Sequence, residues 1–298
     1  MRIASNTVSD GIVRQIQQLG TQQARLQTQV SSGLRISQPE DDPAAVGRVL
    51  NLESERRQLE QFGLNARRAL ALSQASFSGL QGLMKISGRA GELATLGTGL
   101  LGVDAMKAYA TELDQLIEQA LQSGNTRFNG DYIYAGTAVD APPFAATRDV
   151  TGKITTVAYA GNATQASIPL SETTSVAPGT AGSSNVGVQD FINQLVALRD
   201  ALNSGDTAAV SALQGGLTAS EDTLVFAVAE SAGIQTRIEA SLSQRMDRLT
   251  SLDALVSSET DADLPTTIVK LNQIQTAYQA ALQSGASIMR LSLLDYIR

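Results

Sequence analysis

The chain has 298 residues, of which 43% are hydrophobic but only 4% aromatic, and its formal net charge is −7. It contains no cysteine and no histidine, which excludes thiolate nucleophiles, imidazole bases, disulfides and zinc sites of the Cys/His type. The acidic balance argues against nucleic acid as the main partner, because phosphate contacts need clustered Lys and Arg.

Membrane insertion and a cleaved export signal are also disfavoured. No apolar run approaches the roughly 20 residues that a membrane-spanning helix needs. Residues 1–20 are amphipathic and rich in Gln, without the continuous apolar stretch and small-residue cleavage site of a secretory signal. The apolar residues are mostly Leu, Ala, Ile and Val, which suits long helices with narrow apolar seams.

An apolar seam with heptad spacing runs through the N-terminal segment. Its positions alternate in steps of four and three and include one polar residue: Ile12, Ile16, Leu19, Gln23, Leu26 and Val30. This spacing is typical of a helix that packs along one side against another helix. Gly33 and Pro39 then interrupt the pattern, so residues 31–42 are expected to be an irregular connector.

The next helix is expected to begin at Pro43, with Asp42 as its N-cap, because a proline at the first helical position loses no hydrogen bond. It is predicted to run to about Leu96, where the Gly-rich stretch 97–102 breaks it. A shorter helix is predicted over about 104–121. It ends at Ser123 and Gly124.

The amino-acid composition changes in the middle of the chain, which is rich in Gly, Pro, Thr and Ser from about residue 127 to 187. Short β-prone runs at 132–134, 154–159 and 166–170 predict a small β-rich insertion with hairpins. The polar tract 171–184 is expected to be a surface loop.

Helical patterning returns after the insertion. Apolar positions predict one helix near 191–202, a pause at Gly205 and Asp206, and a long helix to about Val256. The C-terminal helix carries a second seam with one Gln, at Leu264, Ile268, Leu271, Gln275, Tyr278 and Leu282.

The element order is nearly the same read from either end, so the economical fold pairs the first helix with the last and the second with the second-to-last. The predicted fold class is mainly α with a β-rich insertion, an elongated antiparallel helical rod or coiled coil. Three regions are expected: a terminal coiled-coil inner core (1–42 and 264–298), a helical rod (43–130 and 189–263) and a β-rich outer insertion (131–188).

Several motifs in a fixed order resemble those of the flagellin family and its hook-associated members. SSGLRI at 31–36 and PEDDPAA at 39–45 resemble the family's N-terminal motif. NTRFNG at 125–130 with YIYAG at 132–136 is similar to its turn before the β region, and ETDAD at 259–263 with SLLDY at 292–296 resembles its C-terminal end. The resemblance covers about the first 140 and the last 45 residues.

The resemblance implies a non-enzymatic structural subunit of the bacterial flagellum, exported through the flagellar type III channel and assembled helically outside the cell. The implied partners are further copies in a helical ring, a hook-associated protein on the hook side, flagellin on the filament side, the filament cap and an export chaperone. No cofactor is implied. The prolines around Asp41 and Asp42, with Pro142 and Pro143, look more like a hook-to-filament adaptor than a short filament flagellin, which stays the alternative.

Functions of other classes find less support in the sequence. The Gly-rich stretch 97–102 is not a phosphate loop, because no Gly-Lys-Ser/Thr follows it. Glu40, Asp41 and Asp42 lack the alternate spacing of a calcium loop and are suited to a helix N-terminus. A component of a related secretion system and a carboxylate-dependent hydrolase remain as alternatives.

The candidate functional residues are therefore those of assembly. Inter-subunit packing is assigned to the seam residues Ile12, Ile16, Leu19, Leu26, Val30, Ile268, Leu271, Tyr278 and Leu282. In the connector, Arg35 is a candidate for an ion pair, and Asp41 and Asp42 are candidate contact residues.

The two terminal seams predict that the ends of the chain become fully ordered only against neighbouring subunits. A helix with one narrow seam buries too little apolar surface to offset the conformational entropy that it loses. In the free monomer, backbone NMR order parameters over residues 12–30 should therefore be lower than in the central helices. Equal rigidity in both regions would contradict this expectation.

Overall fold

The computed structural model describes residues 2–99 and 102–296, with side-chain surroundings for 10–99 and 102–287. Its helices are α1 (Arg2–Ser32), α2 (Pro43–Gly97), α3 (Val103–Gly124), α4 (Gly182–Ser204), α5 (Thr207–Thr260) and α6 (Leu264–Tyr296). Three two-stranded antiparallel sheets lie between α3 and α4: β1 (Arg127–Phe128) with β2 (Asp131–Tyr132), β3 (Phe144–Arg148) with β4 (Ile154–Tyr159), and β5 (Ile168–Pro169) with β6 (Ser175–Val176). The predicted mainly α fold with a β-rich insertion is confirmed.

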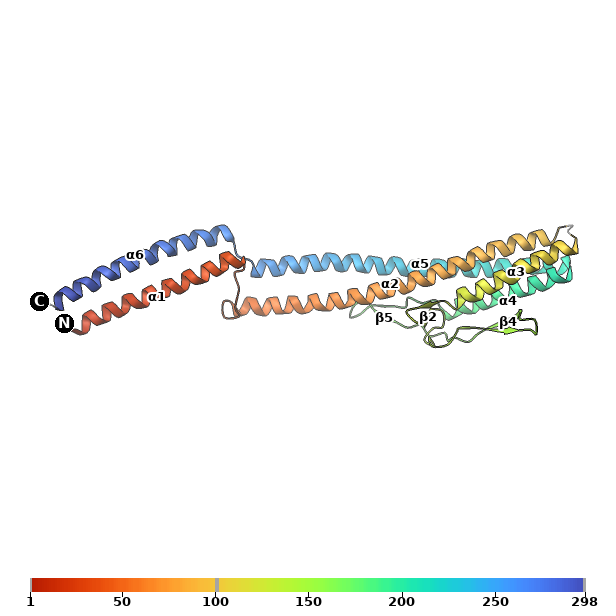
Figure 1. Ribbon diagram of the computed structural model, residues 1–298, viewed down its shortest axis with the longest axis horizontal. Helices are drawn as coiled ribbons and strands as arrows, with labels where there is room; N and C mark the ends of the chain where they lie inside the picture. Colours follow the sequence, from red (N-terminus) through yellow and green to blue (C-terminus); the bar gives the residue numbers. More distant parts are fainter. Residues whose placement is uncertain (1, 100–101, 297–298) are drawn as a thin grey trace. The chain divides into compact units, whose positions relative to one another are not determined.

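The chain divides into two compact units. The first consists of residues 1–58 and 248–298 and the second of residues 59–247. In the first unit α1 pairs with α6, while the first part of α2 lies beside the last part of α5 (Figure 1). The second unit contains the remainder of α2 and α5 together with α3, α4 and the β strands.

The second unit has a closed hydrophobic core made by four helices. Side chains from α2, α3, α4 and α5 meet there, and many are fully excluded from solvent: Leu80, Leu83, Leu93, Leu113, Phe191, Leu195, Leu198, Leu202 and Val210. Helices α3 and α4 pack directly on each other, and β4 lies against α4. Burial of this many large apolar side chains is the main stabilising contribution to the unit.

The start of α2 follows the sequence prediction. The helix begins at Pro43, and the Asp42 carboxylate accepts a 3.0 Å hydrogen bond from the backbone N–H of Ala45. This is the N-cap arrangement, in which a side-chain oxygen satisfies a backbone donor that the helix cannot. The predicted N-cap role of Asp42 is confirmed.

A buried polar cluster attaches the β-rich insertion to α2 and α4. Asn185, at the start of α4, is 1% exposed and donates to the Tyr134 carbonyl at 2.9 Å and the Tyr159 hydroxyl at 3.1 Å. The Tyr134 hydroxyl donates to the Ser76 carbonyl of α2 at 2.8 Å. Asn193 makes two further bonds to the backbone of Val157 in β4. The insertion is thus held by side chains that satisfy its backbone groups.

Two features of the insertion differ from the sequence prediction. The tract 171–184 was expected to be a surface loop, but it contains β6 and the first turn of α4. Val176 is 3% exposed and packs with Ala66, Ala69 and Ile238. The expectation was wrong because a single apolar residue among polar ones gives no periodic pattern in the sequence. Burial of that one residue is nevertheless enough to hold a two-residue strand in place. Strand β3 was missed because the two alanines at its centre carry a weak β signal.

The buried cluster predicts a stability effect of Asn185→Ala. The substitution leaves the Tyr134 carbonyl without this donor and Thr180 without its acceptor in a site that excludes water. Leaving buried polar groups unsatisfied costs about 1–3 kcal/mol, so the free energy of unfolding in urea should fall by that amount. Asp140→Ala, at an exposed site in the same insertion, is the matched control. An unchanged stability for Asn185→Ala would contradict the role of the cluster.

Candidate assembly surfaces in the first unit

Helices α1 and α6 run side by side in opposite directions (Figure 1), and a glycine of each lies near side chains of the other. A methyl group at Gly285 would lie 3.2 Å from Ile12 Cγ2 and 3.4 Å from Ile16 Cδ1. At the other crossing, a methyl group at Gly20 would lie 3.6 Å from Tyr278 Cε2. A side chain at Gly285 would therefore be tight against Ile12, whereas one at Gly20 would make an ordinary van der Waals contact.

The seam residues of α1 lie where the heptad spacing predicts. Ile12, Ile16, Leu19, Leu26 and Val30 are all half-buried. None of them is fully covered, because among the described residues α6 is the one helix that makes extensive contact with α1.

The contact face of α6 differs from the predicted seam. Leu271 and Tyr278 are half-buried as part of a face that also contains the buried Thr267 and Gly285. Ile268 and Leu282 lie outside this face and are each 44% exposed. The predicted seam included them because it was built from large apolar residues. The buried positions of α6 are instead a threonine and a glycine.

The middle of the pair is also incompletely filled. A groove of about 320 Å³ lies between the helices and is lined by Leu26 and Ile274 together with polar and charged residues, which are Gln22, Arg25, Gln29, Lys270 and Gln273. The pair therefore leaves apolar surface in contact with solvent on several sides.

The connector after α1 is joined to the segment between α5 and α6 by backbone hydrogen bonds. The Arg35 N–H donates to the Thr260 carbonyl at 2.7 Å, and the Ala262 N–H donates to the Gly33 carbonyl at 2.8 Å. Gly33 has φ +73°, a left-handed conformation that residues with a Cβ rarely adopt. These bonds bring together motifs that lie more than two hundred residues apart in the sequence.

The connector arginine makes two kinds of contact. Arg35 lies 3.2 Å from the Asp42 carboxylate, and its other terminal nitrogen donates to the Glu259 carbonyl at 2.6 Å. Arg48 of α2 makes a bidentate pair with the Glu259 carboxylate at 2.9 and 2.8 Å. Arg48 and Glu259 were not among the residues selected from the sequence. Glu259 stands in the motif at 259–263, but nothing local links it to Arg48.

Asp41 has a separate role. Its carboxylate accepts hydrogen bonds from the backbone N–H groups of Ser37 at 3.0 Å and Gln38 at 3.1 Å, and it pairs with Arg25 of α1 at 3.0 Å. It therefore holds the turn of the connector and ties it to α1. Arg35 and Asp41, which lie close in sequence, have different partners.

The carboxylates of the connector are stabilised in their charged forms. The backbone N–H of Ser37 lowers the pKa of Asp41, and that of Ala45 lowers the pKa of Asp42. The hydrogen bonds from Arg48 lower the pKa of Glu259. Hydrogen bonds to the ionised form favour it, and the arginines add an attractive charge.

The chemistry of this region is that of structural contacts. Among the residues that the structure describes, no group of three or more Asp or Glu side chains is arranged to hold a metal ion. Within the same residues no helix is both long enough and apolar enough to cross a membrane. The carboxylates of the connector instead accept backbone donors and pair with arginines.

Comparisons with known proteins agree with the resemblance. Residues 3–139, just under half of the chain, match the family model for the bacterial flagellin N-terminal helical region. Flagellar hook-associated protein 3 of Salmonella typhimurium is 28% identical over 148 residues, which is 48% of this chain and 46% of that relative. Flagellar hook-associated protein 3 of Escherichia coli is 25% identical over 297 residues, 89% of this chain and 90% of that relative.

Solved structures share the fold. A protein of Vibrio parahaemolyticus assigned as flagellar hook-associated has a TM-score of 0.66 at 17% identity, with 74% of this chain and 100% of that chain covered. FlgL of Bacillus cereus has a TM-score of 0.61 at 18% identity and covers 70% of this chain and 99% of its own. In its N-terminal region and its fold, the chain is similar to flagellins and their hook-associated relatives. Within that class it resembles flagellar hook-associated protein 3 over nine-tenths of its length.

The connector contacts predict the titration of three carboxyl groups. Carboxyl NMR should place the pKa of Asp41 and Asp42 below 3.8 and that of Glu259 below 4.5. Because these folded values are lowered, the groups stabilise the connector at neutral pH, and this contribution is lost as the pH falls through the folded pKa.

The Arg48→Gln variant distinguishes the contact of Glu259 from the contacts of Asp41. It should raise the pKa of Glu259 toward its ordinary value, because the charged bidentate hydrogen-bond donor of this carboxylate is removed. The pKa of Asp41 should stay the same, since its partners are Ser37, Gln38 and Arg25. A pKa of Glu259 that does not respond to this change would show that the bidentate pair is absent in solution.

Proposed function

We propose that the chain is a structural subunit of the bacterial flagellum that joins hook to filament. The observation that carries this proposal is the incomplete burial of the α1–α6 pair. Val13, Ile268, Val269 and Leu282 remain 39%, 44%, 56% and 44% exposed. An exposed apolar surface of this kind is suited to packing against further helices, as neighbouring copies would supply in a helical assembly.

The adaptor role is supported by the relatives, two of which carry the name flagellar hook-associated protein 3. On this proposal the subunit packs against further copies in a ring, with a hook-associated protein on one side and flagellin on the other. It is exported unfolded through the type III channel, with a chaperone before export and the filament cap present during growth. The protein acts through these contacts and not as an enzyme.

The seam assignment is part of the proposal. Ile12, Ile16, Leu19, Leu26 and Val30 of α1, with Leu271 and Tyr278 of α6, are partly covered within one copy. Neighbouring copies would complete their burial. Ile268 and Leu282, which are each 44% exposed, would depend on a neighbour for their burial.

The second candidate is a short filament flagellin, which the flagellin N-terminal match also allows. The two functions differ in how far assembly proceeds. Purified protein added to isolated hooks should stop at a ring or short layer if it is an adaptor, and should grow long filaments if it is a flagellin. Electron microscopy of the seeded hooks distinguishes these results, and no addition to the hooks at all would contradict both.

A substitution pair tests the role of the exposed apolar residues on α6. Ile268→Asp with Leu282→Asp should greatly reduce addition to hooks, because carboxylates at these positions would be desolvated against a neighbour. Asn272→Asp with Gln279→Asp adds the same two charges at exposed polar sites of the same helix and is the control. Circular dichroism should show equal helix content in both variants. Equal addition by both would remove these residues from the interface.

A further inference from the structure

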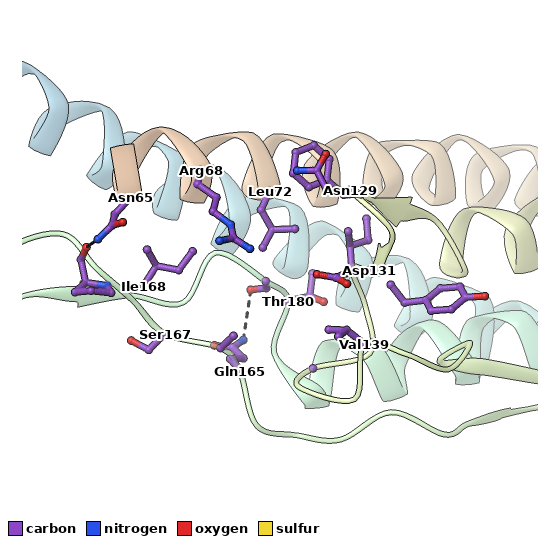
Figure 2. A pocket seen from close by; sticks show the side chains of 17 residues that line it. Asn65, Arg68, Leu72, Asn129, Asp131, Val139, Gln165, Ser167, Ile168 and Thr180 are labelled. Atoms are coloured by element: carbon purple, nitrogen blue, oxygen red, sulfur yellow. Dashed lines mark hydrogen bonds between the residues drawn. The ribbon is translucent and has the colours of Figure 1, made fainter. Parts of the chain in front are cut away.

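A cavity of about 380 Å³ lies in the second unit between α2 and the β-rich insertion (Figure 2). Its apolar lining includes Leu72, Phe128, Ile133 and Ile168, while Asn65 and Arg68 of α2 stand on one wall. The volume is within the range of about 300–1,000 Å³ typical of pockets that enclose small organic groups. The cavity is therefore large enough to receive an aromatic side chain.

The walls of this pocket are held in place by the chain itself. The Asn65 side-chain amide donates to the Pro169 carbonyl at 3.2 Å, and that of Gln165 donates to the Gly179 carbonyl at 3.4 Å. The second of these bonds is drawn in Figure 2. A pocket with such supported walls loses little conformational entropy when it is filled.

The two sides of the pocket differ in charge. Arg68 extends from α2 toward the cavity, and Asp131 lies on the β-strand side (Figure 2). Arg68 is exposed, and among the described residues it forms no ion pair. A group with a carboxylate is thus favoured on the α2 side and disfavoured beside Asp131.

The same unit also presents an aromatic side chain to solvent on α5. Phe226 is 68% exposed and Val225 is 46% exposed, whereas Leu224 and Ala227 face the core and are buried. Phe226 is the only aromatic residue among the large hydrophobic side chains that are exposed in the described part of the chain. Asp222 and Glu230, one helical turn to either side, are also exposed, so the phenyl ring stands between two carboxylates.

We propose that in the assembly Phe226 of one copy inserts into this pocket of the next copy, with Asp222 and Glu230 beside Arg68. The inference rests on the proposed self-assembly and names one of its contacts. Phe226 is not part of the lining of the pocket in its own chain. Because the two surfaces are different, the contact is head-to-tail and can repeat around a ring. Because a carboxylate stands on each side of Phe226, the charges favour an approach of α5 along the Arg68 wall of the mouth, away from Asp131.

Cross-linking tests the contact directly, because the chain has no cysteine of its own. We would introduce Ser167→Cys at the pocket and Ala229→Cys one turn from Phe226, both at exposed sites, and treat hook-seeded assemblies with a short bis-maleimide. A ladder of covalent multimers is expected from assembled protein and none from dilute monomer. A pair with Thr111→Cys in place of Ala229→Cys is the control for random collisions.

Side-chain variants give a second measurement. Phe226→Ala should reduce both the ladder and the rate of addition to hooks about tenfold or more, the size typical of losing a central interface aromatic. Val150→Ala, which alters an exposed valine on the β3–β4 turn, should assemble normally. Arg68→Glu should weaken assembly, and combining it with Asp222→Lys and Glu230→Lys should restore it.

The outcomes separate this inference from the proposed function. If the unmodified chain adds to hooks but Phe226→Ala adds equally well and the cysteine pair gives no ladder, the pocket contact is overturned and the adaptor role stands. If the unmodified chain does not add to hooks, the proposed function fails first. Because Phe226 is exposed, its replacement leaves the core intact, which circular dichroism and urea unfolding of the variants verify.

Discussion

The number of helices that share an apolar surface decides how much of it is hidden from water. In the second unit α2, α3, α4 and α5 enclose one core, and residues such as Leu113 and Phe191 are fully buried. In the first unit α1 and α6 have mainly each other. Two helices can cover only the facing strip of each, so even the seam residues Ile16 and Leu19 stay half-buried. The hydrophobic effect therefore completes one unit and leaves the other available for further packing.

The connector brings motifs that are distant in the sequence into direct contact. Arg35 contacts both its near neighbour Asp42 and the backbone of Glu259, while Arg48 holds the Glu259 carboxylate with two hydrogen bonds. Exposed ion pairs contribute little individually to stability. Their geometry here is nevertheless specific, because bidentate arginine contacts and backbone bonds on both sides of Gly33 restrict the path of the chain.

The β-rich insertion is attached to the helices by buried hydrogen bonds. Its strands are short and could not persist as isolated pairs in water, so they depend on Asn185, Asn193 and Tyr134 for attachment to the helices. This attachment also builds the pocket beside α2. The insertion thereby gives the second unit a shaped surface that differs chemically from the apolar helix faces.

The sequence by itself determined the helices, the N-cap at Asp42, the seam of α1 and the resemblance to flagellins, because helical periodicity and capping depend on residues close in the chain. Tertiary structure alone decided the contact face of α6, where Thr267 and Gly285 replace the expected Ile268 and Leu282. It also decided the pairing of Arg48 with Glu259 and the strand at Val176. These features depend on which small residue lets two helices approach and which distant group lies within hydrogen-bond reach, and neither property is encoded in local spacing.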